Sequence, residues 1–230
     1  PAFIYNNRSI PPMKGKVSYI GFIKNASVNL INMDTSMVLS TTTTNNIGYF
    51  ELQLDTIPDI MKTNNKIDFF KITATGGTDI GTDKANTIEI KLISYNYVIF
   101  TSNPIKYVLT PASTIVENKY EKSLGVSLKN SPNIDKNKLV IPRLNTVQEL
   151  NTIENEVARA FGLASFDNTI NPITENNISY ALMNIHITTI IDGIKEIFIT
   201  VEKIDIPNDN IMEYISNNIT NTEISYNALL

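Results

Sequence analysis

The chain has no cysteine, no tryptophan and a single histidine, His186. Without cysteine it cannot form a disulfide, a thiolate nucleophile or a cysteine-ligated metal site. One histidine also leaves too few nitrogen and sulfur ligands for zinc. A Ser-His-Asp triad would have to use His186, and no Gly-x-Ser-x-Gly turn is present to carry the serine. We therefore interpret His186 as a structural or surface residue, and expect neither enzymatic activity nor a cofactor.

Charged residues are sparse, at 18%, and the net charge is −4. This balance lacks the basic surface that binds phosphates, so nucleic acid is not an expected partner. The longest isoleucine-rich stretch, Ile185–Val201, is interrupted by His186, Asp192, Lys195 and Glu196. No segment therefore reaches the roughly 20 apolar residues that a membrane span needs.

The sequence starts with Pro-Ala-Phe-Ile and has no initiator methionine. Either a signal peptide preceded this point and was removed, or the chain was trimmed at its start. Absence of thiols fits an exported protein and a cytosolic one equally. From the first alternative we expect a secreted protein located outside the cell or at its surface.

The stretch Gly15–Leu54 alternates apolar and polar residues in short runs separated by turn residues. Such alternation indicates β-strands with one buried and one exposed face. In the last run, Phe50 and Leu52 are predicted to face the core, and Glu51 to face the solvent. The stretch is therefore predicted to form a small antiparallel sheet.

Further strands are predicted at Lys66–Thr75, Thr87–Ile93 and Tyr95–Phe100, with a glycine-rich loop at Gly76–Asp83. The total of about seven strands is enough for a two-sheet sandwich. We predict an α+β protein whose N-terminal antiparallel β-sandwich covers residues 14–108.

The period of the apolar residues changes near residue 110. Thr110 suits a helix cap, Pro111 the first helical position and Gly125 the helix end. Thr146 and Glu149 have the spacing of a capping box at the start of a second helix. That helix has one apolar stripe, made of Val147, Leu150, Ile153, Val157 and Phe161.

A longer helix is predicted over residues 174–201, although its β-branched content and Gly193 weaken the helix propensity. Some of its residues recur every three or four positions: Ile178, Leu182, Ile185, Thr189, Ile194, Ile197 and Val201. A last short helix is predicted at Asp209–Asn217. The helices define a second domain over residues 109–222, followed by a tail over 223–230 that is predicted to be a free strand or frayed.

Several short motifs of the first half resemble carboxypeptidase-regulatory-like domains, which are transthyretin-like β-sandwiches: Gly15-Lys16-Val17, Asn25–Val28 and Gly48-Tyr49-Phe50. Later motifs are similar to the helical region that often follows such sandwiches in bacterial surface and adhesin-like proteins: Gly76–Asp79, Leu109–Val116, Val157–Leu163 and Asn171-Pro172. The resemblance covers roughly residues 14–200. It implies an Ig- or transthyretin-like fold and an extracellular setting, and assigns no catalytic residue. Ala112-Ser113 depart from a Thr-Pro-Leu-Thr-Thr-like motif.

Acidic residues offer two candidate sites. Asp79 and Asp83, in the glycine-rich loop, could place oxygen ligands around Ca²⁺, and a plain turn is the alternative. Paired acids on the predicted helices could serve glycoside hydrolysis, but no aromatic platform accompanies them. These acids are Glu149, Glu154 and Glu156 on the second helix and Asp192 and Glu196 on the longer one. We predict that they lie on solvated helix faces.

Extended apolar residues at the start of the chain suggest assembly. Phe3, Ile4 and Tyr5 show no helical period and precede the rigid pair Pro11-Pro12. Such a segment can pair with its own sheet, or it can be donated to the open sheet edge of a neighbouring subunit. The segment 1–13 is thus a candidate donor strand.

These observations predict a secreted structural protein, a subunit of an extracellular fibre or adhesin-like assembly that associates with copies of itself by strand donation. The competing hypothesis is an extracellular ligand-binding module. Its ligand would be a carbohydrate, bound by Tyr49, Tyr95, Tyr97 and neighbouring loops.

Overall fold

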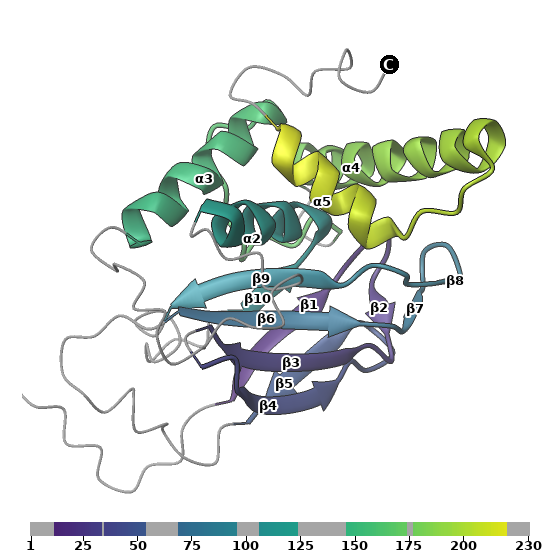
Figure 1. Cartoon of the computed structure of the whole chain (residues 1–230). Helices are drawn as coiled ribbons and strands as arrows, with labels where there is room; N and C mark the ends of the chain where they lie inside the picture. The colour runs from purple at the N-terminus through teal and green to yellow at the C-terminus, as the bar shows by residue number, and fades with distance from the viewer. Residues whose placement is uncertain are drawn as a thin grey trace, which may run out of the picture. The chain divides into compact units, whose positions relative to one another are not determined.

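The computed structural model describes residues 12–33, 35–53, 69–95, 106–123, 146–173 and 177–219. Within these residues the protein is α+β, with ten β-strands, four α-helices and one π-helix. The predicted α+β class is therefore confirmed. The chain forms two compact units, residues 1–109 and residues 110–230 (Figure 1). The first is called the β-unit and the second the helical unit.

The strands of the β-unit are β1 (Met13–Val17), β2 (Ile23–Lys24), β3 (Ser27–Asn32), β4 (Val38–Thr43), β5 (Tyr49–Leu52), β6 (Phe69–Thr75), β7 (Thr78–Asp79), β8 (Lys84–Ala85), β9 (Ile90–Tyr95) and β10 (Lys106–Leu109). They form a four-stranded sheet in the order β4-β3-β6-β9 and two three-stranded sheets, β10-β1-β5 and β2-β7-β8. All the pairings are antiparallel except the parallel pair of β1 with β10.

The alternation predicted for the first sheet is confirmed in β5, where Phe50 and Leu52 are buried and Glu51 is exposed. Gly15 on β1 lies opposite Phe50. A Cβ atom at Gly15 would overlap the Phe50 ring and the carbonyl oxygen of Tyr107 on β10. The close approach of these strands therefore requires glycine at this position.

The predicted number of strands is wrong, because the described part of residues 13–95 already contains nine strands instead of about seven. The stretch Gly76–Asp83, predicted as a loop, contains β7, which pairs with β2 and β8. Each of these three strands has two residues, too few to show an alternating pattern. Strand β10 was not predicted either, and residues 96–100 of the predicted strand Tyr95–Phe100 lie outside the described residues.

Two side-chain hydrogen bonds link the four-stranded sheet to the sheet β10-β1-β5. The Ser94 hydroxyl on β9 donates to the Tyr107 hydroxyl on β10 at 3.2 Å. Burial raises the pKa of Tyr107 to about 12, so this phenol is neutral at physiological pH. The Ser40 hydroxyl on β4 donates to the carbonyl of Gln53, directly after β5, at 2.7 Å.

The helical unit contains α2 (Pro111–Ser123), α3 (Thr146–Ala160), α4 (Ile178–Ile197), the π-helix η2 (Phe198–Glu202) and α5 (Asn208–Asn218). The predicted cap of α2 is confirmed, because the Thr110 hydroxyl accepts a hydrogen bond from the Ser113 amide at 3.1 Å. The Ser113 hydroxyl accepts from the Thr110 amide at 2.9 Å, which closes the first turn reciprocally. The capping box predicted for α3 involves the Thr146 side chain, which lies outside the described part.

Helix α2 makes polar side-chain contacts with α3 and with α5 or the residue after it. Lys119 on α2 forms an ion pair with Glu156 on α3 at 3.3 Å and donates to the Ile219 carbonyl after α5 at 3.3 Å. Asn118 donates to the Ser216 hydroxyl on α5 at 3.2 Å. The buried residues of α3 include Leu150, Ile153 and Val157, as its predicted stripe requires.

Helix α4 runs without a break through Gly193, and its start is capped by Asn177, whose side chain accepts from the Tyr180 amide at 3.2 Å. Its buried residues are Tyr180, Met183, Asn184, Ile187, Thr188, Ile191 and Ile194. Most of the recurring residues singled out from the sequence lie instead on the exposed side. The regular spacing thus predicted the helix but marked the wrong face.

Candidate functional site

The carboxylate of Asp79 joins two turns of the β-unit. It is 2% exposed and accepts hydrogen bonds from four backbone amides. Those of Ile20 and Gly21 lie at 2.9 and 2.8 Å, and those of Gly81 and Thr82 at 2.7 and 3.1 Å. Hydrogen bonds from backbone amides to a carboxylate are short and strong, so Asp79 fixes the chain around it.

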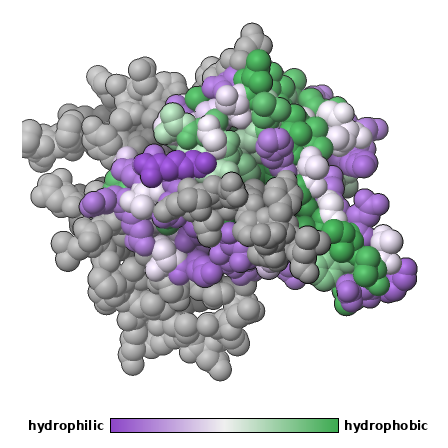
Figure 2. Space-filling view, turned by 90° about the horizontal axis from the view of Figure 1, so that it is seen from above, coloured by the Kyte–Doolittle hydropathy of each residue, from purple (hydrophilic) through white to green (hydrophobic). Residues whose placement is uncertain are grey.

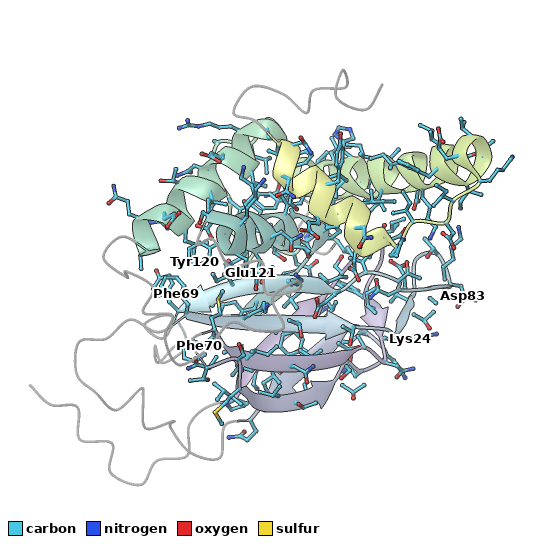
Figure 3. All side chains as sticks on the ribbon, viewed as in Figure 1. Lys24, Phe69, Phe70, Asp83, Tyr120 and Glu121 are labelled. Atoms are coloured by element: carbon cyan, nitrogen blue, oxygen red, sulfur yellow. The ribbon has the colours of Figure 1, made fainter. Side chains whose placement is uncertain are left out.

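This arrangement bears on the predicted calcium site at Asp79 and Asp83. Both oxygens of Asp79 face N–H donors, whereas Ca²⁺ requires oxygen atoms directed at the ion. Asp83 is exposed in the turn between β7 and β8, with a left-handed φ of 55° (Figure 3). No cluster of three or more His, Cys, Asp or Glu side chains suited to a metal occurs among the described residues. The contacts of Asp79 are those of a turn-stabilising carboxylate.

The tyrosines of the carbohydrate hypothesis do not share one sheet. The Tyr49 hydroxyl on β5 donates to Glu51, which also pairs with Lys14 at 3.1 Å. These two hydrogen bonds lower the pKa of Glu51. Tyr95 lies on β9 of the four-stranded sheet, where its ring is 5.9 Å from that of Phe69. Tyr97 lies outside the described residues.

Strand β4 is a terminal strand of the four-stranded sheet, and within the described residues it pairs with β3 alone. None of its six residues is buried. Met37 and Val38, where β4 begins, are large apolar residues that are mostly exposed. Edge strands usually carry charge or proline that prevents further pairing, and β4, with the sequence VLSTTT, has neither.

Phe3, Ile4 and Tyr5, the residues predicted to mediate assembly, lie outside the described residues. That they pair with a sheet edge, of their own chain or of a neighbour, stays a prediction.

Helix α4 presents a second apolar surface, here called the α4 stripe and made of Ile178, Leu182, Ile185 and Thr189. All four residues are exposed. The Thr189 hydroxyl donates to the Ile185 carbonyl at 2.8 Å, so the polar end of this side chain is already used within the helix. Figure 2 shows hydrophobic side chains gathered over the helices. No helix of the described part is long and apolar enough to cross a membrane.

A third feature lies between α3, α4 and the loop that joins them. Glu154 on α3 was predicted to be solvated, and this prediction is wrong, because the residue is half-buried. Burial raises its pKa to about 7, and the negative charge of Asp167 adds to the rise. Tyr180 on α4 donates to the Ser165 carbonyl of the loop at 3.0 Å, and its ring lies 6.4 Å from that of Phe166. These contacts hold the loop against α4, and Asp167 of the same loop lies close enough to Glu154 to influence its pKa.

The other acidic positions follow the prediction more closely. Asp192 and Glu196 on α4 are exposed. Glu156, in contrast, is half-buried like Glu154, and it forms an ion pair with Lys119. His186 is exposed on α4, which agrees with its interpretation as a surface residue.

No family model, no curated protein and no solved structure matches this chain. The resemblance to carboxypeptidase-regulatory-like domains therefore stays a prediction, and the candidate sites depend on the geometry of this chain alone. Of the features above, β4 and the α4 stripe expose apolar groups to the solvent, and both are suited to contact with other protein chains. Sequence reasoning named the residues of the α4 stripe as recurring helix positions but did not predict that they form an exposed surface, although the lack of charge in 177–191 was a visible signal. It did not single out β4 as a terminal strand.

Proposed function

We propose that this protein is a secreted structural protein, a subunit of an extracellular fibre or adhesin-like assembly at the cell surface. The observation that carries the proposal is β4, a terminal strand without a charged residue, in which Val38 is exposed and which follows the exposed Met37. A strand of this kind is a template for pairing with another chain. The proposed role is therefore structural, and the protein would perform it by binding to neighbouring subunits.

Within this proposal the four-stranded sheet and the sheet β10-β1-β5 form the layers of a transthyretin-like β-sandwich. The hydrogen bonds from Ser94 to Tyr107 and from Ser40 to Gln53 support this arrangement, because each links one sheet to the other. Buried apolar residues on both sheets, such as Leu30 on β3, give the sandwich its core. A rigid sandwich is a suitable building block because its edges keep a fixed direction.

The donated strand in this proposal is the segment Ala2–Asn7, which contains Phe3, Ile4 and Tyr5. An extended segment added to β4 of a neighbour gains main-chain hydrogen bonds along its length, while alternate side chains find pockets that fix the register. Because the donor and the acceptor are different surfaces, each subunit can receive one strand and give another. Repetition of such a head-to-tail contact produces an open filament.

Two variants of the full chain test strand donation. Deletion of residues 1–10 removes the donor, and Val38→Lys places a charge at the acceptor strand. We expect each to fold, as judged by circular dichroism, and to lose the high-mass species that the unchanged chain forms in sedimentation velocity. Ile47→Lys is the matched control, because Ile47 and Val38 are both 55% exposed and Ile47 lies in a turn.

We expect Ile47→Lys to assemble like the unchanged chain. Continued polymerisation after deletion of residues 1–10 would rule out the donor role. Equal behaviour of Val38→Lys and Ile47→Lys would rule out β4 as the acceptor.

A further inference from the structure

The four-stranded sheet and the sheet β10-β1-β5 end in four terminal strands, which are β4, β9, β10 and β5. Three of them contain a charged residue: Lys91 in β9, Lys106 in β10 and Glu51 in β5. Charge on a terminal strand discourages pairing with another chain. Strand β4, at the outer end of the four-stranded sheet, has none (Figure 1). Among the described terminal strands of these two sheets, β4 is therefore the one open to a further strand.

The main-chain groups of β4 point alternately towards β3 and away from it, because the two strands are antiparallel. Directly after β4, the Thr44 N–H donates to the carbonyl of Ala26, the residue before β3, at 2.9 Å. Thr44 therefore points towards β3, and Thr42, two residues earlier, points the same way. The N–H and C=O groups of Thr41 and Thr43 then point to the open edge of the sheet.

This regular part of the edge is short. The register of β4 against β3 shifts between Leu30 and Ile31 of β3. Beyond the shift, the Met37 carbonyl accepts from the amide of the last β3 residue at 2.9 Å. An odd-numbered residue thus points inwards there, whereas Thr41 and Thr43 point outwards. Such a bulge breaks the even spacing of main-chain groups, so the evenly spaced donors and acceptors of the edge are those of Thr41 and Thr43.

The side chain of Thr41 is already used within the sheet. Its hydroxyl donates to the Asn29 side-chain oxygen on β3 at 2.8 Å. What Thr41 offers to another chain is therefore its main chain. Strands that add to a sheet edge gain their affinity from such main-chain hydrogen bonds.

We propose that β4 binds an extended segment of a second copy of this chain through the outward N–H and C=O groups of Thr41 and Thr43. The inference rests on the proposed function and names the atoms of its acceptor site. A segment that pairs here needs free N–H groups at alternate residues, so it cannot have proline at those positions. The donor segment Ala2–Asn7 contains no proline.

Amide hydrogen exchange of the unchanged full chain tests this pairing residue by residue. In dilute solution we expect the Thr41 and Thr43 amides to exchange several-fold faster than the Thr42 amide, which points towards β3. At concentrations where sedimentation velocity shows heavy species, we expect exchange at Thr41 and Thr43 to become several-fold slower. The Thr42 amide is the internal control, and its rate should change little.

The outcomes separate this inference from the proposed function. Heavy species in which Thr41 and Thr43 exchange as fast as in dilute solution would leave the assembly standing and overturn the pairing. Absence of heavy species at every concentration would overturn both. Equal exchange at Thr41 and Thr42 in dilute solution would contradict the outward direction of Thr41.

Two substitutions at one position separate the main chain from the side chain. Thr41→Pro removes an outward N–H and breaks no bond to β3, as proline is tolerated on edge strands. We expect it to fold, as judged by circular dichroism, and to lose the heavy species. Thr41→Ala keeps the N–H, and we expect it to assemble like the unchanged chain. Equal assembly by the two variants, whether retained or lost, would overturn the proposal, and the exchange measurement depends on the folding of neither.

Discussion

Asp79 shows how one residue can determine the shape of a loop region. Its carboxylate accepts from amides of two separate turns. In Asp79→Asn one oxygen becomes an NH₂ group that faces N–H donors, so bonds to a charged acceptor are lost and a buried donor is left without an acceptor. We expect the free energy of unfolding of the β-unit to fall by about 2–4 kcal/mol, the order expected for charged hydrogen bonds with a buried unsatisfied group.

Urea denaturation followed by tyrosine fluorescence measures this change, since tryptophan is absent. Asp83→Asn is the control, because Asp83 is exposed in the next turn, and surface changes of this kind usually stay within about 0.5 kcal/mol. Equal destabilisation by the two variants would contradict the role given to Asp79.

At the residue scale, the features that could be predicted from the sequence are those that depend on residues nearby in the chain. The inward direction of Phe50 follows from alternation, and the cap formed by Thr110 follows from the residues beside it. The contacts of Asp79 could not be predicted, because its donors at Ile20 and Gly21 are 59 and 58 residues away in the chain. Only the folded β-unit brings them together.

At the scale of elements, the packing of α3 against the loop before α4 is expected to depend on pH. Burial raises the pKa of Glu154 from the ordinary value of 4.5 to about 7. Between these two values the folded chain holds a proton that the unfolded chain has released, so stability falls as the pH rises from about 4.5 to about 7. After a discount for partial exposure, we expect a loss of about 1–2 kcal/mol.

Glu154→Gln removes the titrating group, and we expect it to stabilise the helical unit at pH 8 while changing little at pH 4.5. Thermal unfolding followed by circular dichroism at 222 nm, at both pH values, measures the difference. Glu196→Gln is the control because Glu196 is exposed on α4. Parallel pH profiles for the unchanged chain and Glu154→Gln would show that the glutamate is not the source of the dependence.

The elements themselves were predicted unevenly. Helix α5 lies within one residue of its predicted bounds at each end. The core stripe of α3 follows from a clear period. The buried face of α4 could not be predicted in this way. Apolar residues lie on both sides of that helix, so their spacing does not show which side is buried. Strands β2 and β7 pair residues such as Ile23 and Asp79 that are far apart in the chain, and no local pattern marks strands of two residues.

At the scale of the whole molecule, the proposed contact between copies lies in the β-unit. The terminal strand β4 would receive the strand donated by a neighbour. Repetition of this head-to-tail contact would give an open filament.

The proposed function requires that this chain associates with copies of itself. Sedimentation velocity of the unchanged chain over a range of concentrations measures this association. We expect species heavier than the 25.7 kDa monomer, and we expect their share to increase with concentration. A single 25.7 kDa species at every concentration would contradict it.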